Sequence, residues 1–170
     1  GGTIQPLDEI KALRKGADEL GLALHLDGAR IWNAHVASGV ALNEYGKYFE
    51  TISVCLSKGL GAPIGSVMLS TKDRVTKARI WRKRYGAGMR QVGLLAGAAH
   101  YALDNNISRL SEDHRRAKEI AIAIASVDAS LIDPNAVETN IVGLDLGALP
   151  ITAAELAART KEAGLWISAL

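Results

Sequence analysis

The stretch TISVCLSKGLGAPIGS, residues 51–66, joins a run of β-branched residues to a glycine-rich loop and carries a single lysine, Lys58, at the junction. β-Branched residues favour strands and glycine interrupts them, so this pattern predicts a buried strand over residues 51–57 that ends at Lys58. Burial favours the neutral form of a lysine, whose amine then attacks aldehydes. We therefore predict that Lys58 is buried and that it forms a Schiff base with the aldehyde of a cofactor.

A second strand pattern lies upstream, in LALHLDGAR, residues 22–30. The apolar run over residues 22–26 ends at Asp27, and Arg30 follows closely. Ligands of open α/β sheets bind beyond the carboxyl ends of the strands, so we expect Asp27 and Lys58 at the same rim. This pair suits pyridoxal 5′-phosphate, because a carboxylate keeps the pyridine nitrogen protonated while the lysine holds the aldehyde. Arg30 would offer a two-pronged donor to the carboxylate of an amino acid.

Three motifs together resemble one enzyme family. They are HLDGARIWNA at residues 25–34, CLSKGLGAPIGS at residues 55–66 and RKRYGAGMRQ at residues 82–91. Their order and spacing resemble those of the L-threonine aldolases, of the low-specificity and L-allo types, and the resemblance covers essentially the whole chain. These are fold-type I pyridoxal-phosphate enzymes. The resemblance therefore implies an α/β fold, a partial aspartate aminotransferase-like large domain followed by the start of a small C-terminal α/β domain.

The resemblance also implies an activity and roles for individual residues. The activity is aldol cleavage of L-threonine or L-allo-threonine, which are small β-hydroxy-α-amino acids, to glycine and an aldehyde. Lys58 and Asp27 become the catalytic residues and hold the cofactor together with Lys83 and Arg90, while Arg30 binds the substrate. Lys83 and Arg90 are expected near the cofactor phosphate, partly across a subunit interface of a homo-oligomeric dimer or tetramer.

Two departures from the family pattern are visible. The family has three consecutive glycines before its Met-Arg-Gln, whereas Ala87 replaces the middle one here, which a loop tolerates unless that residue needs a positive φ. The family's proteins are also much longer, with a phosphate-binding loop and a histidine that stacks on the cofactor ring in their N-terminal half. We therefore expect this chain to be a fragment that lacks this N-terminal part and is inactive by itself.

Helix and strand patterns alternate along the chain, as a βαβ protein requires. A domain boundary is expected near residue 105, with residues 1–105 in the large domain and residues 106–170 forming an interdomain helix and the start of the small domain. The predicted helices cover residues 6–21, a segment after Asp27, a basic segment that is capped by Thr71 and runs to Arg84, residues 93–102 in the interior, residues 107–126 and residues 152–163. The helix over residues 107–126 has an apolar side formed by Leu110, Ala117, Ile120 and Ile124. The predicted strands cover residues 22–26, 51–57, 66–70 and 139–146, a further strand starts at Leu165, and a turn is expected at residues 133–135.

Composition narrows the classes of partner. The 170 residues are 48% hydrophobic with a net charge of +2, which is typical of a globular protein and argues against nucleic acid. The basic stretch of residues 72–90 carries no nucleic-acid recognition motif. No apolar run approaches about 18 residues, so no membrane association is expected. The single cysteine, Cys55, excludes an internal disulfide and agrees with a reducing cytoplasm.

The four histidines show no metal-ligand spacing, so no metal site is predicted, and only His25 is placed to support Asp27 from the same strand. Two alternatives to the aldolase interpretation remain open. One is another fold-type I lyase or an aminotransferase, against which the Gly-Met-Arg-Gln motif stands because it resembles the aldolases. The other is a catalytically silent fragment that acts only by association.

Overall fold

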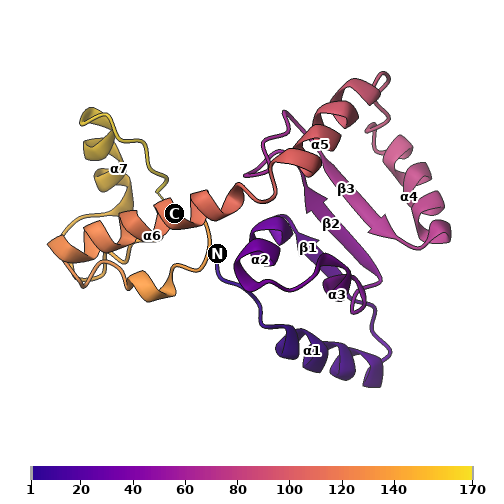
Figure 1. Cartoon of the computed structure of the whole chain (residues 1–170), viewed down its shortest axis with the longest axis horizontal. Helices are drawn as coiled ribbons and strands as arrows, with labels where there is room; N and C mark the ends of the chain where they lie inside the picture. Colours follow the sequence, from indigo (N-terminus) through magenta and orange to yellow (C-terminus); the bar gives the residue numbers. More distant parts are fainter. Residues whose placement is uncertain (1, 170) are drawn as a thin grey trace.

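The chain folds into two lobes, one around a small sheet and one around a long helix (Figure 1), in a computed structural model that describes residues 2–169. The elements follow one another in the order α, β, α, α, β, β and then helices only. They are α1 Leu7–Glu19, β1 His25–Gly28, α2 Ile31–Ser38, α3 Leu42–Gly46, β2 Thr51–Cys55, β3 Ser66–Ser70, α4 Lys72–Arg84, α5 Gly93–Asn105, α6 Leu110–Val127, the 3-10 helix η1 Pro134–Ala136 and α7 Ala153–Glu162.

The sheet has the order β1-β2-β3, with β1 parallel to β2 and β3 antiparallel to β2. In the parallel pair Asp27 lies opposite Ser53, and Gly28 lies opposite Val54. A Cβ on Gly28 would stand 2.9 Å from the carbonyl oxygen of Ser53, so only glycine allows the strands to approach this closely. The predicted strand at 66–70 is confirmed, and the strand predicted over 51–57 forms but ends at Cys55. The parallel pairing gives the sheet the rim at which ligands were expected.

The strand predicted at 22–26 begins later, at His25. Side chains occupy the backbone groups just before it. The carboxylate of Glu50 accepts a hydrogen bond from the N–H of Leu24 at 2.6 Å, and Arg14 donates to the carbonyl oxygen of Leu22 at 2.9 Å. Because these groups are satisfied by side chains, the segment joins α1 to the sheet instead of extending the strand.

One face of the sheet is the core of the first lobe. Ile52 and Val54 of β2 are buried there against Ile10 of α1, Ile31 of α2 and Tyr45 of α3. Each fully buried residue of this size stabilises the fold by about 1.5–3 kcal/mol. The alternation along β2 sends the intervening side chains to the opposite face, which is polar and partly exposed.

The loop after β2 forms a second core with α5. Leu56 and Leu60 of the loop are buried against Ala99 and Ala102 of the helix. The prediction of an interior glycine- and alanine-rich helix therefore holds for one side only. The other sides of α5 face solvent, and Leu94 is 81% exposed, since no other element covers them in residues 2–169.

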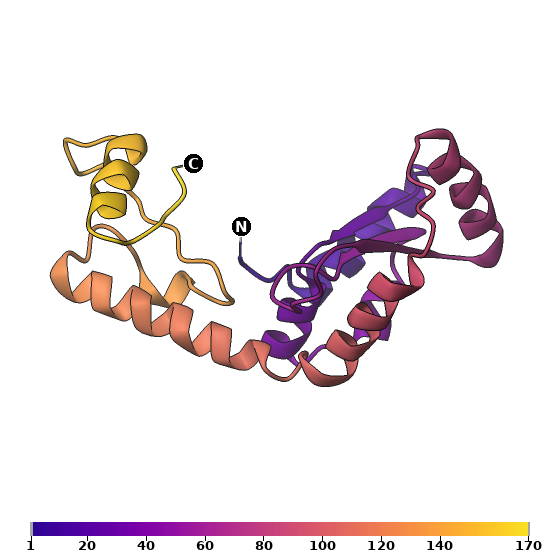
Figure 2. The same cartoon turned by 90° about the horizontal axis from the view of Figure 1, so that it is seen from above.

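Helix α6 leads from the first lobe into the second, as the two views show (Figures 1 and 2). Of its predicted apolar side, Leu110 and Ala117 are buried, but Ile120 is 52% exposed and Ala121 is buried in its place. The buried residues 110, 117 and 121 therefore lie along a narrower stripe of the helix surface than the predicted set. The short helix η1 packs against α6 and replaces the predicted turn at 133–135.

The helix boundaries follow the end signals in the sequence. α1 carries Asp8 and Glu9 in its first turn and ends before Gly21, whose φ of +65° is the left-handed conformation that stops a helix. α7 begins with a capping box in which Thr152 and Glu155 bond reciprocally. Thr71 is the N-cap residue of α4, as predicted, but its side chain makes no capping hydrogen bond.

The strands predicted at 139–146 and from Leu165 are absent from residues 2–169, where both segments are irregular. A strand requires a neighbouring backbone as hydrogen-bond partner. Thr139 is instead buried beside the N-terminal segment and donates its hydroxyl to the carbonyl oxygen of Gly2. Throughout the described part of the chain, no helix combines the length and apolar character needed to span a bilayer.

Candidate functional site

Asp27 is the residue before the end of β1, on the polar face of the sheet. It is exposed, and its Oδ1 accepts a hydrogen bond from the backbone N–H of Ala29 at 3.1 Å. This small turn holds the carboxylate at the point where the chain leaves the strand. Its remaining acceptor capacity faces outward, as a partner for a cationic ring nitrogen requires.

Lys58 lies in the loop of residues 56–65, three residues after the end of β2. The loop is closed by its own backbone bonds: Leu56 N–H donates to the Gly65 oxygen at 2.9 Å, Ala62 N–H to the Leu56 oxygen at 3.0 Å, and Gly61 N–H to the Lys58 oxygen at 2.8 Å. The prediction that Lys58 is buried is wrong, because its side chain is exposed. Its neighbour Ser57 is also exposed, and Gly59 is only partly buried.

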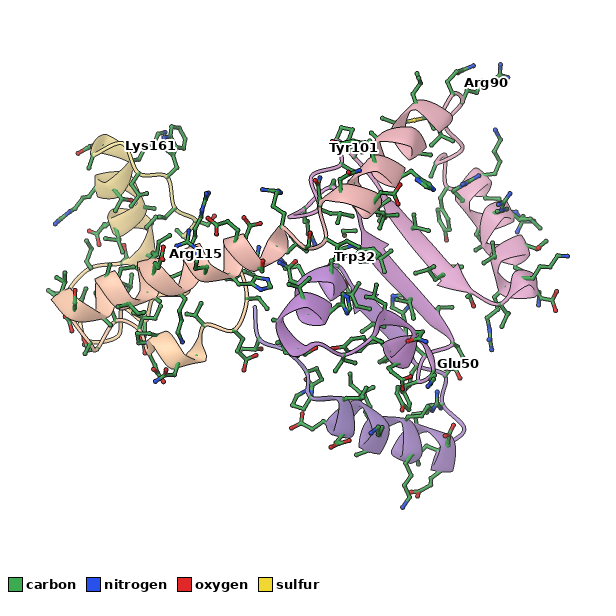
Figure 3. All side chains as sticks on the ribbon, in the orientation of Figure 1. Trp32, Glu50, Arg90, Tyr101, Arg115 and Lys161 are labelled. Carbon is green, nitrogen blue, oxygen red and sulfur yellow. The ribbon has the colours of Figure 1, made fainter. Side chains whose placement is uncertain are left out.

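The parallel register brings the two residues to the same rim. Asp27 pairs with Ser53, and Lys58 comes five residues further along the neighbouring strand and loop. The side chain of Trp32 reinforces this arrangement, since its Nε1–H donates to the Cys55 oxygen at 2.8 Å (Figure 3). This bond ties the first turn of α2, which Arg30 immediately precedes, to the end of β2, which the Lys58 loop follows.

Arg30 immediately precedes α2, and its exposed side chain lines a cavity of about 240 Å³ together with Asp27, Asn33 and Thr139. The cavity lies between the end of β1, the start of α2 and the N-terminal segment. It is smaller than the roughly 300–1,000 Å³ of a complete cofactor or drug-sized pocket. Its size and its guanidinium suit the carboxylate end of an amino acid better than a whole cofactor.

Lys83 and Arg90 lie elsewhere in the molecule. Lys83 is near the end of α4, and Arg90 is in the loop before α5 (Figure 3). Both side chains are exposed. The opposite end of α5 touches the Lys58 loop, and a helix of 13 residues is about 20 Å long. Within one copy, the structure therefore separates this basic pair from the rim with Asp27 and Lys58.

The loop between α4 and α5 accommodates its departure from the family pattern. The residues there with positive φ are Gly86 and Gln91, not Ala87. The methyl group of Ala87 is therefore tolerated, as expected. A Cβ on Gly88 would stand 2.8 Å from Cδ of Lys83, a contact that the flexible, exposed lysine side chain can relieve by moving.

Two of the histidines lie close to the site residues. His25 lies on the polar face with Asp27, and its Nδ1 is 2.8 Å from the Thr51 hydroxyl. His114 of α6 contacts the buried amide of Asn33 at 3.1 Å, and partial burial lowers the pKa of His114, opposed by Asp113. Sequence patterns carried no signal for Asn33 or Trp32, whose partners are distant in the chain. No group of three metal-ligating side chains occurs in residues 2–169.

The donor set fits part of pyridoxal phosphate. Asp27 can pair with a ring nitrogen, Lys58 can hold an aldehyde, and the polar sheet face beside them carries the small side chain of Ser53. The basic residues available for the phosphate are at the far end of α5. Asp27 and Lys58 can therefore meet a cofactor ring and aldehyde, whereas the basic residues that could meet its phosphate lie away from this rim.

Comparison with known proteins agrees with this geometry. Residues 1–146 match the beta-eliminating lyase family. The chain is 42% identical to the low specificity L-threonine aldolase of Escherichia coli strain K12 over 86% of its length, and 43% identical to the low-specificity L-threonine aldolase of Candida albicans over 86%. These alignments span 43% and 39% of the relatives, so the chain covers less than half of their length.

The fold is also shared with solved structures. A protein from Listeria monocytogenes named as an L-allo-threonine aldolase superposes with a TM-score of 0.75 and 27% identity, over 82% of this chain and 39% of that one. A threonine aldolase from Leishmania major superposes with a TM-score of 0.63. These likenesses confirm the predicted α/β fold class, a part of the aspartate aminotransferase-like fold. With its motifs, its rim of aspartate and lysine and its match over residues 1–146, the chain belongs to the beta-eliminating lyase family of pyridoxal-phosphate-dependent enzymes.

Proposed function

We propose that the protein containing this chain is a carbon–carbon lyase of the threonine aldolase type, which cleaves β-hydroxy-α-amino acids to glycine and an aldehyde. The observation that carries the proposal is the rim formed by the parallel strands β1 and β2, where Asp27 lies at the end of β1, Lys58 lies in the loop after β2, and Asp27 and Arg30 line a cavity. The names of the relatives from E. coli and C. albicans support the same substrate class.

Each residue has a distinct task in this proposal. The bound cofactor supplies an electron sink for the bond between Cα and Cβ of the substrate. Asp27 would keep the ring nitrogen protonated, Lys58 would provide the amine that holds the aldehyde, and Arg30 would bind the substrate carboxylate.

We further propose that Lys83 and Arg90 bind the cofactor phosphate of another copy of the protein. Their separation from the rim within one copy supports this arrangement, and it requires a homo-oligomer, a dimer or tetramer. The division into residues 1–105 and 106–170 is proposed as the boundary between the large domain and the interdomain helix with the start of the small domain. The change from a sheet-based lobe to a helical one near α6 supports that boundary (Figure 1).

A second candidate within the same family is β-elimination from an amino acid. One observation favours it: the likeness to a structure from Exiguobacterium whose name includes both aromatic amino acid beta-eliminating lyase and threonine aldolase, at 25% identity and a TM-score of 0.74. Aldol cleavage yields glycine and an aldehyde, whereas elimination yields ammonia and a keto acid. The products therefore distinguish the two activities.

The test uses the protein expressed from its complete reading frame. Purified protein is incubated with pyridoxal phosphate and L-threonine or L-allo-threonine, and glycine, aldehyde and keto acid are quantified. We expect equal amounts of glycine and acetaldehyde, and we expect Lys58→Ala to abolish both while Lys15→Ala, at an exposed lysine of α1, has no effect. Keto acid without glycine would favour elimination, and no product would favour a silent protein that acts only by association.

A further inference from the structure

The Lys58 loop is held from outside by the junction between α5 and α6. The side-chain amide nitrogen of Asn106 donates to the carbonyl oxygen of Leu60 at 2.8 Å. Leu110, the first residue of α6, is fully buried, and a Cβ on Gly59 would stand 2.9 Å from its Cδ2. Arg109 adds a longer contact of 3.5 Å to the Gly59 oxygen. The loop and the junction are therefore closely packed, although they are far apart in the sequence.

The hydrogen bond of Asn106 acts on a particular peptide plane. The carbonyl group of Leu60 and the N–H of Gly61 belong to one planar unit, so fixing one orients the other. That N–H donates to the carbonyl oxygen of Lys58 at 2.8 Å. Asn106 therefore holds, through a single rigid plane, the group that anchors the backbone of Lys58.

Gly61 makes this plane dependent on an outside partner. Its φ of +81° is a conformation that glycine adopts at little cost, but glycine adopts other backbone conformations just as easily. Asn106 Nδ2 would be 3.5 Å from a Cβ at this position, so its amide lies directly over the turn. Without that donor, the buried carbonyl of Leu60 would lose its partner and the turn would gain conformational freedom.

We propose that Asn106 is a positioning residue for Lys58: it orients the Leu60–Gly61 peptide so that the lysine amine is presented at the rim beside Asp27. The inference rests on the proposed function, because it assigns the geometry a role in cofactor attachment. In this proposal the orientation of Lys58 depends on the junction between α5 and α6, which leads to the second lobe.

The experiment compares Asn106→Ala and Asn106→Asp with the wild type and with Asn105→Ala. Aspartate keeps the shape of asparagine but is no donor at neutral pH. Asn105 is a matched control, because its side chain bonds only to the Tyr101 oxygen of its own helix at 2.8 Å. All proteins are expressed from the complete reading frame, and their melting temperatures are measured so that folded protein is compared with folded protein.

Two readouts are taken. Hydrogen exchange of the peptide covering residues 56–65 is measured without cofactor, and the rate of covalent trapping at Lys58 is measured with pyridoxal phosphate and borohydride as a function of pH. We expect both Asn106 variants to exchange about three- to tenfold faster and to be trapped about three- to tenfold more slowly, the change that loss of one hydrogen bond of ordinary strength produces. We expect Asn105→Ala to match the wild type in both.

The outcomes separate the two proposals. Faster exchange together with slower trapping in both Asn106 variants supports the positioning role. Trapping at the wild-type rate and pH dependence in Asn106→Ala overturns it, whether or not exchange changes, because the residue would then be structural only. A wild-type protein in which Lys58 is not trapped overturns the proposed function, and the positioning role with it.

Discussion

At the scale of single residues, Asp27 and Glu50 show two uses of a carboxylate in one small sheet. Asp27 is exposed at the rim, and its Oδ1 accepts a hydrogen bond from Ala29 in a local turn. Its carboxylate therefore remains accessible to a ligand. Glu50 is part-buried just before β2, where one carboxylate oxygen accepts from the N–H of Leu24 and both oxygens accept from Nη1 of Arg14. Asp27 is therefore available to bind a ligand, whereas Glu50 stabilises the fold.

We predict that Asp27→Asn leaves the fold intact and lowers turnover of β-hydroxy amino acids by several orders of magnitude, with a modest loss of cofactor affinity. Asparagine keeps the Oδ1 acceptor for Ala29, but it lacks the charge that holds a ring nitrogen protonated. The measurement is kcat and cofactor Kd in the full-length protein. Near-normal kcat with cofactor retained would refute the assigned role of Asp27.

We predict a pH-dependent stability contribution from Glu50. The Leu24 N–H, and more weakly Arg14, lower the pKa of this carboxyl below its usual value of 4.5 in the folded state, while partial burial opposes them. Because the folded-state pKa is the depressed one, the stabilisation is complete above pH 4.5 and is lost as the pH falls through the folded-state pKa.

Thermal melts of Glu50→Gln at several pH values measure this contribution. We expect a melting temperature several degrees below that of the wild type at pH 7 and a difference that shrinks toward pH 3. Glu19→Gln, at an exposed glutamate near the end of α1, is the control and should melt like the wild type. A difference between Glu50→Gln and wild type that does not change with pH would contradict the prediction.

At the scale of elements, the parallel pair β1 and β2 is the unit that positions the rim. Trp32 ties α2 to the end of β2, Asn106 ties α5 to the following loop, and Gly28 allows the two strands to approach. Three contacts from three different elements thus converge on the same short edge. The rim is therefore a product of packing between elements, although each residue in it belongs to a recognisable local motif.

Gly28→Ala tests this close approach. The added Cβ would stand 2.9 Å from the Ser53 carbonyl oxygen, which belongs to the backbone and cannot move alone, so we expect a loss of about 1–3 kcal/mol in the free energy of unfolding. Gly16→Ala is the matched control. It lies within α1 with no atom within 4 Å of the new Cβ, and we expect it to stabilise the protein by about 0.5–1 kcal/mol. Urea unfolding measures both, and equal effects of the two substitutions would exclude steric contact as the cause.

At the scale of the whole molecule, large apolar side chains are exposed on α4, on the start of α5 and on the loop between them. Trp81 and Tyr85 stack there with ring centroids 6.0 Å apart, and Tyr85 and Leu94 are more than 80% exposed. Exposed large apolar side chains that gather in one region favour association with another surface in water. The same region carries Lys83 and Arg90, so the apolar surface and the proposed phosphate ligands belong together.

We predict that residues 1–170, produced alone, self-associate and bind pyridoxal phosphate weakly, without cleaving threonine. Leu94→Glu should reduce the associated fraction, because it places a charge within the α4–α5 surface, whereas Val127→Glu, at an exposed position at the end of α6, should not. Sedimentation velocity measures association, and an absorbance titration measures cofactor binding. A monomeric chain with tight binding and turnover would show that the prediction is wrong.

Local patterns in the sequence were sufficient for much of this protein. The β-branched run at 51–57, the apolar run that ends at Asp27 and the end signals of α1 and α7 act through neighbours in the chain, and the strands and helices follow them. The rim of Asp27 and Lys58 could be predicted for the same reason, since parallel strands bring their carboxyl ends to one edge. The motifs around these residues also identified the family.

Tertiary structure decided the rest. Extended residues at 139–146 form no strand, because pairing depends on a second backbone, and Thr139 bonds to Gly2 instead. The exposure of Lys58 and the separation of Lys83 and Arg90 from it depend on which elements cover the rim and on the length of α5. The contacts of Trp32 with Cys55 and of Asn106 with Leu60 join residues 23 and 46 positions apart, and their formation depends on how helices dock on the sheet, which no local pattern encodes.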